Sequence, residues 1–118
     1  MVGKPSEPSI TQINVEELAQ RLSSGEPIQL VDVREPQEVA IAHIDGFVNL
    51  PLSQFPDWAD QVNTRLDPHA ETLVLCHHGI RSAQMCQWLT VQGFTNVKNI
   101  MGGIDAYSTL VDSSIPQY

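Results

Sequence analysis

Short apolar segments alternate with amphipathic segments along most of the chain, and this alternation limits the folds that are open to it. Residues 28–33 and 72–75 are mostly apolar, as expected of strands that helices cover on both faces. Residues 15–22 and 82–92 carry apolar side chains at helical spacing. Strands that alternate with helices form mostly parallel sheets. The sequence therefore predicts an α/β domain whose five-stranded, mostly parallel sheet is flanked by helices on both faces.

Start and stop signals place the remaining elements. Asn14 and Glu17 have the spacing of a capping box, and Gly25 is expected to end that helix. Residues 52–66 carry enough apolar side chains for one continuous helix, with Pro56 near its start. Further strands are expected at residues 10–13, 47–50 and 97–101, and further helices at residues 37–42 and 103–110.

The length and composition fit one globular domain, because 118 residues with 42% hydrophobic content can bury a single core. Residues 1–9 are rich in proline and serine and predict a flexible N-terminal tail before a folded domain at residues 10–118. A net charge of -8 would repel a phosphate backbone, so nucleic acid is not an expected partner. No apolar run is long enough to span a membrane and no secretory signal is evident, so we expect a cytoplasmic protein without a membrane partner.

Two cysteines, Cys76 and Cys86, are too few for a disulfide scaffold or a four-cysteine zinc site. They are expected to remain unpaired, since one lies on a predicted loop and the other on the helix that follows. Ala83, Cys86 and Leu89 form an apolar stripe on this helix, which predicts that Cys86 is buried and does not act as a resolving thiol.

Cys76 stands at the carboxyl end of a predicted strand, the edge of a parallel sheet at which ligands bind. Backbone N–H groups at the start of the next helix, together with Arg81, should favour its nucleophilic thiolate form. Gly79 permits the backbone to turn these N–H groups inward, where they can hold a persulfide or a sulfonate group. The candidate active-site loop consists of Cys76, His77, His78, Gly79, Ile80, Arg81 and Ser82.

Several motifs around this loop carry a family resemblance. In chain order they are residues 30–35 (LVDVRE), 42–46 (AHIDG), 49–51 (NLP) and 93–103, which begins with GF and ends with GG. With the cysteine loop they make residues 11–118 resemble the rhodanese family of sulfurtransferases. From Cys76 to Arg81 the loop has six residues, as in sulfur-transferring members, whereas related cell-cycle phosphatases have a loop one residue longer. Ala42 replaces the glycine that the family often has, which we expect to alter a turn only.

The resemblance implies a rhodanese-like domain in which Cys76 takes sulfur from a donor and holds it as a persulfide. Suitable donors are thiosulfate, mercaptopyruvate or a protein persulfide, and the acceptor is a thiol or cyanide. This chemistry requires no metal and no other cofactor. The resemblance also makes Asp32 and Arg34 supports of the active loop. A local ion pair between Arg34 and Glu38, four residues later, is an equally open role for Arg34.

The remaining polar side chains of the loop have less defined roles. Arg81 is expected to orient anionic donors where the loop closes. His77 and His78 are expected to be solvent-exposed histidines that at most tune the thiolate. Neighbouring histidines rarely converge on one ion and the sequence offers no evident third ligand, so we expect no metal site.

Two other functions use the same fold. The first is a docking or sulfur-relay module for a partner protein, because residues 116–118 (PQY) resemble the end of rhodanese domains fused to ubiquitin-activating-like adenylyltransferases. The second is a phosphatase or arsenate reductase that uses Cys76 and Arg81. A six-residue loop is one residue short for that chemistry, so this function is the less favoured.

Overall fold

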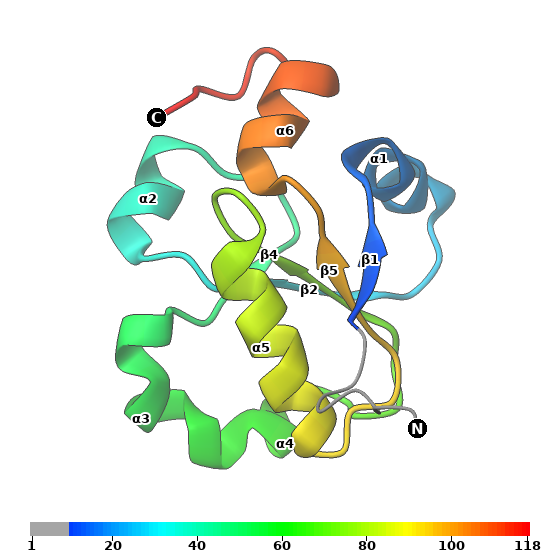
Figure 1. The fold of residues 1–118 in the computed structure, drawn as a ribbon, viewed down its shortest axis with the longest axis vertical. Helices are drawn as coiled ribbons and strands as arrows, with labels where there is room; N and C mark the ends of the chain where they lie inside the picture. Colours follow the sequence, from blue (N-terminus) through cyan, green and yellow to red (C-terminus); the bar gives the residue numbers. More distant parts are fainter. Residues whose placement is uncertain (1–9) are drawn as a thin grey trace, which may run out of the picture.

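A five-stranded sheet forms the centre of the computed structural model, which describes residues 10–118 (Figure 1). Its strand order is β1-β5-β4-β2-β3 and every pairing is parallel, which confirms the predicted α/β architecture. The predicted tail lies outside the described residues, so the domain boundary stays a prediction. The strands are β1 (Thr11–Ile13), β2 (Gln29–Asp32), β3 (Val48–Asn49), β4 (Thr72–Leu75) and β5 (Val97–Ile100).

Helices cover both faces of this sheet (Figure 1). The alternation of side chains along β4 sends Leu73 and Leu75 into a core cluster with the helices α1 and α6, and Val74 and Cys76 into a second cluster with α5. Within the described residues no helix has the length and apolar character needed to cross a membrane. The longer helices are α1 (Val15–Ser24), α2 (Pro36–Ile41), α5 (Ile80–Val91) and α6 (Gly103–Leu110).

The first helix begins and ends at the predicted residues. The Asn14 side chain accepts a hydrogen bond from the Glu17 N–H at 2.8 Å, and the Glu17 carboxylate accepts one from the Asn14 N–H at 2.9 Å. Gly25 follows the last residue with a φ of 76°, the left-handed conformation that ends many helices. The capping box is therefore confirmed.

The prediction of one continuous helix over residues 52–66 is wrong. Pro56 has no N–H, so it cannot bond to the Leu52 carbonyl, which instead accepts from the Phe55 N–H in a tighter 3-10 turn. The Trp58 indole also donates to the Pro51 carbonyl at 2.8 Å and holds the turn against the core. The segment comprises η1 (Leu52–Gln54), α3 (Phe55–Trp58), η2 (Ala59–Gln61) and α4 (Val62–Arg65).

Candidate active site

The cysteine loop joins the central strand β4 to α5. Cys76 directly follows β4, and α5 begins at Ile80, two residues before the predicted start at Ser82. Ile80 and Arg81 therefore lie in the first helical turn, and only residues 76–79 form the connection. This short connection places Cys76 beside the N-terminal end of α5, where unpaired backbone N–H groups carry partial positive charge.

The sulfur of Cys76 is buried and points toward the start of α5. Its Sγ accepts a hydrogen bond from the Gly79 N–H at 3.0 Å and lies 3.3 Å from the Ser82 hydroxyl oxygen. Gly79 has a φ of 100°, which turns its N–H toward the sulfur. Asn99 on β5 accepts a hydrogen bond from the Ser82 hydroxyl and donates one to the Gly79 carbonyl at 3.1 Å. Asn99, which is not among the sequence-predicted site residues, thus holds both residues that contact the sulfur.

The other side of the loop is bonded to the N-terminus of α6. The Cys76 carbonyl accepts from the Ile104 N–H at 3.0 Å, and the His77 carbonyl accepts from the Asp105 N–H at 3.1 Å. Gly103 lies so close that a Cβ there would be 2.4 Å from the His77 carbonyl oxygen. The loop carbonyls are thereby directed toward α6, away from the sulfur.

Arg81 forms an ion pair with Glu38 of α2. Its two terminal nitrogens donate to the two Glu38 oxygens at 2.7 and 2.9 Å, and these bonds lower the pKa of Glu38 to about 2. The Arg81 side chain is about one-third exposed. The guanidinium is therefore engaged by a carboxylate, and its predicted contact with an anionic donor stays a prediction.

Asp32 and Arg34 form a buried pair at the end of β2. The Arg34 Nη2 is 2.7 Å from Asp32 Oδ2 and also donates to the Ala42 carbonyl at 2.8 Å. The alternative of an Arg34–Glu38 side-chain pair is wrong, because the Glu38 carboxylate binds Arg81 and Arg34 reaches only the Glu38 backbone carbonyl at 3.4 Å. The Asp32–Arg34 pair holds the backbone segment that carries Glu38. Because Glu38 binds Arg81, the pair supports the active-site loop indirectly, through Glu38.

His77 lies between two aromatic rings. The Tyr118 ring stacks on it at 3.9 Å between centroids, and the His78 ring lies on it at 3.8 Å with a tilt of 32°. His78 is exposed as expected, but His77 is half-buried, and burial lowers its pKa. The Tyr118 hydroxyl accepts from Arg34 at 2.8 Å and donates to Glu38 at 3.0 Å. Tyr118 thus connects residues from three parts of the site, a role that no sequence pattern revealed.

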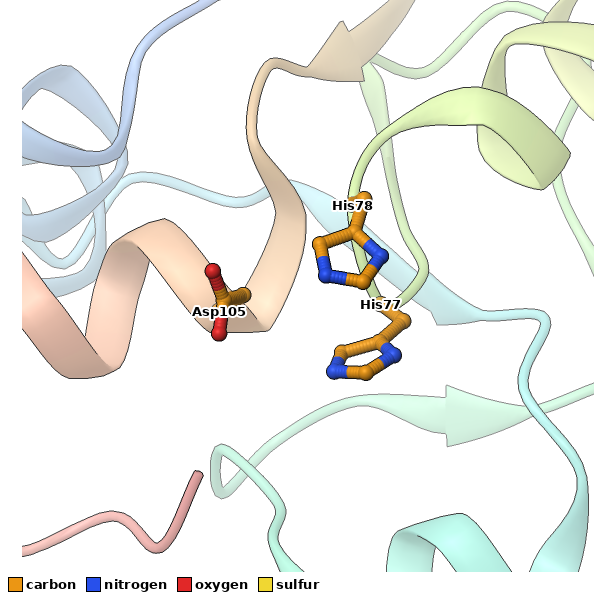
Figure 2. Close-up of side chains that lie close together, drawn as sticks. All are labelled: His77, His78 and Asp105. Carbon is orange, nitrogen blue, oxygen red and sulfur yellow. The ribbon is translucent and has the colours of Figure 1, made fainter. Parts of the chain in front are cut away.

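Asp105 of α6 faces the two loop histidines (Figure 2). His77 and His78 each place one ring nitrogen, and Asp105 one carboxylate oxygen, so that the three atoms lie within 4.8 Å of one another. Asp105 could not be predicted as a third ligand from the sequence, because it is 27 residues beyond His78 and approaches only through the docking of α6 on the loop.

The second cysteine lies on the buried face of α5. Cys86 is buried among apolar side chains and burial raises the pKa of its thiol to about 12. Both cysteines are free, which confirms that they do not pair. The Cys76 thiol therefore has polar partners, whereas the Cys86 side chain packs in the apolar core.

Comparisons with known proteins show the family of this domain. The model of the rhodanese-like domain family matches residues 14–110. The chain is 47% identical over 112 residues to rhodanese-like/PpiC domain-containing protein 12, chloroplastic, of Arabidopsis thaliana, which covers 92% of this chain but 38% of that protein. It is 34% identical to a sulfurtransferase of Allochromatium vinosum, over 84% of this chain and 89% of the relative.

Solved structures show the same architecture. A rhodanese-like domain protein of Staphylococcus aureus superposes with a TM-score of 0.75 at 27% identity, over 92% of this chain and 99% of that structure. The family match extends from the cap of α1 to the end of α6 and includes the cysteine loop, Asp32 and Arg34. The chain belongs to the rhodanese-like domain family.

Proposed function

We propose that this domain moves sulfane sulfur from a donor to a thiophilic acceptor through a persulfide on Cys76. The observation that carries the proposal is the position of the Cys76 sulfur at the N-terminal end of α5, with the Gly79 N–H donating to it at 3.0 Å. Partial positive charge at a helix N-terminus stabilises an anionic sulfur. The backbone N–H groups at this end of α5 can also stabilise the outer sulfur of a persulfide.

The reaction is a double displacement. The Cys76 thiolate attacks the outer sulfur of thiosulfate, the sulfur–sulfur bond of the donor breaks, and sulfite leaves with the bonding electron pair. An acceptor thiolate or cyanide then attacks the outer sulfur of the persulfide, and the Cys76 thiolate leaves. No external electron donor or acceptor takes part, so the transfer needs no cofactor, and mercaptopyruvate or a protein persulfide can replace thiosulfate as the donor.

Intact mass spectrometry, followed by peptide mapping to locate any added mass, tests this proposal directly. We expect reduced protein treated with thiosulfate, mercaptopyruvate or a persulfidated protein to gain one sulfur atom, about 32 Da, on the peptide that contains Cys76. Cyanide should remove this mass and yield thiocyanate, and initial-rate plots should be parallel. The absence of a mass gain with all three donors, or a gain located on Cys86, would contradict the proposal.

The Glu38–Arg81 ion pair leads to a prediction on donor preference. Glu38→Gln removes the negative charge that engages Arg81, while the amide oxygen can still accept the Glu35 N–H bond that Glu38 accepts at 2.9 Å. Freed Arg81 attracts a dianion more strongly. We expect kcat/KM for thiosulfate to rise by about fivefold, equivalent to about 1 kcal/mol of transition-state binding, in a thiosulfate–cyanide assay.

Glu35→Gln is the matched control for this variant. Glu35 lies three residues before Glu38 and its carboxylate bonds to Ser53 rather than to Arg81. We expect its kcat/KM for thiosulfate to stay within about twofold of the wild-type value, since the Glu38–Arg81 ion pair stays intact and the remaining charge effect is screened by salt. An equal change in both variants, or no change in Glu38→Gln, would show that the ion pair does not control thiosulfate use.

A sulfur-relay module is the second candidate function. The chain spans 38% of the length of its Arabidopsis relative, so in that protein the matching part is one region of a larger chain. In a relay, the physiological donor or acceptor is a partner protein. Efficient persulfide formation only from a protein donor would favour the relay, whereas full turnover with small donors would favour an independent enzyme.

A cytoplasmic location stays a prediction, and the Arabidopsis relative is named as chloroplastic.

A further inference from the structure

His77, His78 and Asp105 form a cluster of side chains that sulfur transfer does not use. Both histidines lie on the loop before α5, and Asp105 faces them from the first turn of α6 (Figure 2). Their potential ligand atoms all lie within 4.8 Å of one another. Two imidazoles and a carboxylate are a donor set that zinc and neighbouring transition metals bind in proteins.

Two side chains of this cluster have polar atoms that no hydrogen bond engages within residues 10–118. His77 Nε2 is buried and has no hydrogen-bond partner among residues 10–118. Within the same residues, no hydrogen bond or ion pair engages the carboxylate of Asp105, although its charge acts on His77. A buried polar nitrogen without a partner costs free energy, and a metal ion would satisfy it.

The backbone already holds the two ligand-bearing segments together. The Asp105 N–H donates to the carbonyl of His77 itself at 3.1 Å, and Gly103 allows α6 to approach the loop closely. Most of the ordering that a metal site requires is therefore present in the fold. Only side-chain torsions remain to be set, and preorganisation of this kind reduces the cost of binding.

The distances permit coordination after small side-chain movements. Ligands at roughly 2.0–2.2 Å from a tetrahedral ion lie roughly 3.3–3.6 Å apart, so the atoms of the cluster must approach by about 1.5 Å or less. His78 is exposed, so rotation about its side-chain torsions can bring a ring nitrogen toward the other two ligand atoms. The Tyr118 ring stacks on the face of the His77 ring opposite His78, at 3.9 Å between centroids. The edge of the His77 ring, which carries its nitrogens, is therefore left for an ion.

The geometry points to a binding site for a divalent transition-metal ion, of which zinc is the type, formed by His77, His78 and Asp105. This site replaces the expectation of no metal site, which rested on the lack of a third ligand. Three protein ligands leave a fourth position for water or an anion. The ion would link the active-site loop to α6 and add positive charge one residue from Cys76. The inference does not depend on sulfur transfer.

Calorimetric titration of metal-free protein with Zn²⁺ tests the site. The Cys76→Ser background removes the one thiolate that could bind zinc beside the cluster. We expect one ion per chain in this background, and at least about tenfold weaker binding in Asp105→Asn or His78→Ala, because each loses one coordinate bond. Co²⁺ should report the same site through visible absorption without a thiolate charge-transfer band.

His43→Ala is the matched control. His43 is exposed and lies 3.1 Å from Asp45, so it offers a histidine and a carboxylate without the third ligand. It should leave zinc affinity unchanged. Thermal unfolding without metal checks that each variant is folded, and exposed His78 gives a variant that leaves the core intact. Absence of a one-to-one isotherm, or affinity unchanged in both Asp105→Asn and His78→Ala, would overturn the inference.

Discussion

Replacement of Cys76 by serine is expected to abolish sulfur uptake from every donor and to lower thiosulfate–cyanide activity by at least about 10³-fold. The serine hydroxyl keeps the shape of the site and can still meet the Gly79 N–H and the Ser82 hydroxyl, which contact the cysteine sulfur. It cannot hold sulfur as a persulfide. Intact mass and thiocyanate formation measure the two losses in the same samples.

Cys86→Ala is the matched control for this loss. Cys86 lies on the buried face of α5, and burial raises the pKa of its thiol to about 12, so it carries almost no thiolate at neutral pH. Alanine avoids the placement of a hydroxyl group in an apolar core. We expect this variant to gain sulfur as the wild type does, with only a small loss of thermal stability. Sulfur uptake that persists in Cys76→Ser and disappears in Cys86→Ala would contradict the assignment of the nucleophile.

The second large effect is expected from Arg34→Met. Arg34 is fully buried and pairs with buried Asp32 at 2.7 Å, so methionine would leave the buried Asp32 carboxyl group without its cationic partner. Removal of one member of a buried ion pair costs about 3–5 kcal/mol of the free energy of unfolding. Urea denaturation at pH 7, followed by circular dichroism, measures this cost.

A double-mutant cycle shows whether the pair itself is responsible. Asp32→Asn removes the carboxylate charge, so Arg34→Met should cost less in that background than in the wild type. We expect a coupling free energy of about 1–3 kcal/mol between the two positions. A cost below about 1 kcal/mol for Arg34→Met, or purely additive effects, would mean that the Asp32–Arg34 pair is not a main support of this segment.

The fold was predictable because local patterns agree with the global architecture. The parallel sheet follows from apolar strands that alternate with helices, and the capping box at Asn14 is present in the structure. Residues 52–66 were mispredicted because their apolar spacing suits a helix, whereas Pro56 and the Trp58–Pro51 hydrogen bond favour tighter turns. Periodicity reports which side chains are buried and does not distinguish a continuous helix from a chain of short ones.

The site was predictable only where it is contiguous in sequence. The residues of the loop that begins at Cys76 follow one another in the sequence, so a sequence motif identifies them. Glu38 pairs with Arg81 across 43 residues, and Tyr118 reaches Arg34 across 84 residues. Asn99 reaches Ser82 and Gly79 because β5 pairs with β4. Such partners depend on topology and side-chain direction, and no spacing rule in a single sequence encodes them.

The place of β4 in the sheet has a consequence for motion. β4 lies in the middle of the strand order, between β5 and β2, so its backbone is hydrogen-bonded along both edges and its residues are all buried. Amide protons in such a strand exchange with solvent only when the whole domain unfolds. The segment before Cys76 should therefore show the slowest exchange in the protein, and any opening that admits an acceptor should be confined to residues 77–79.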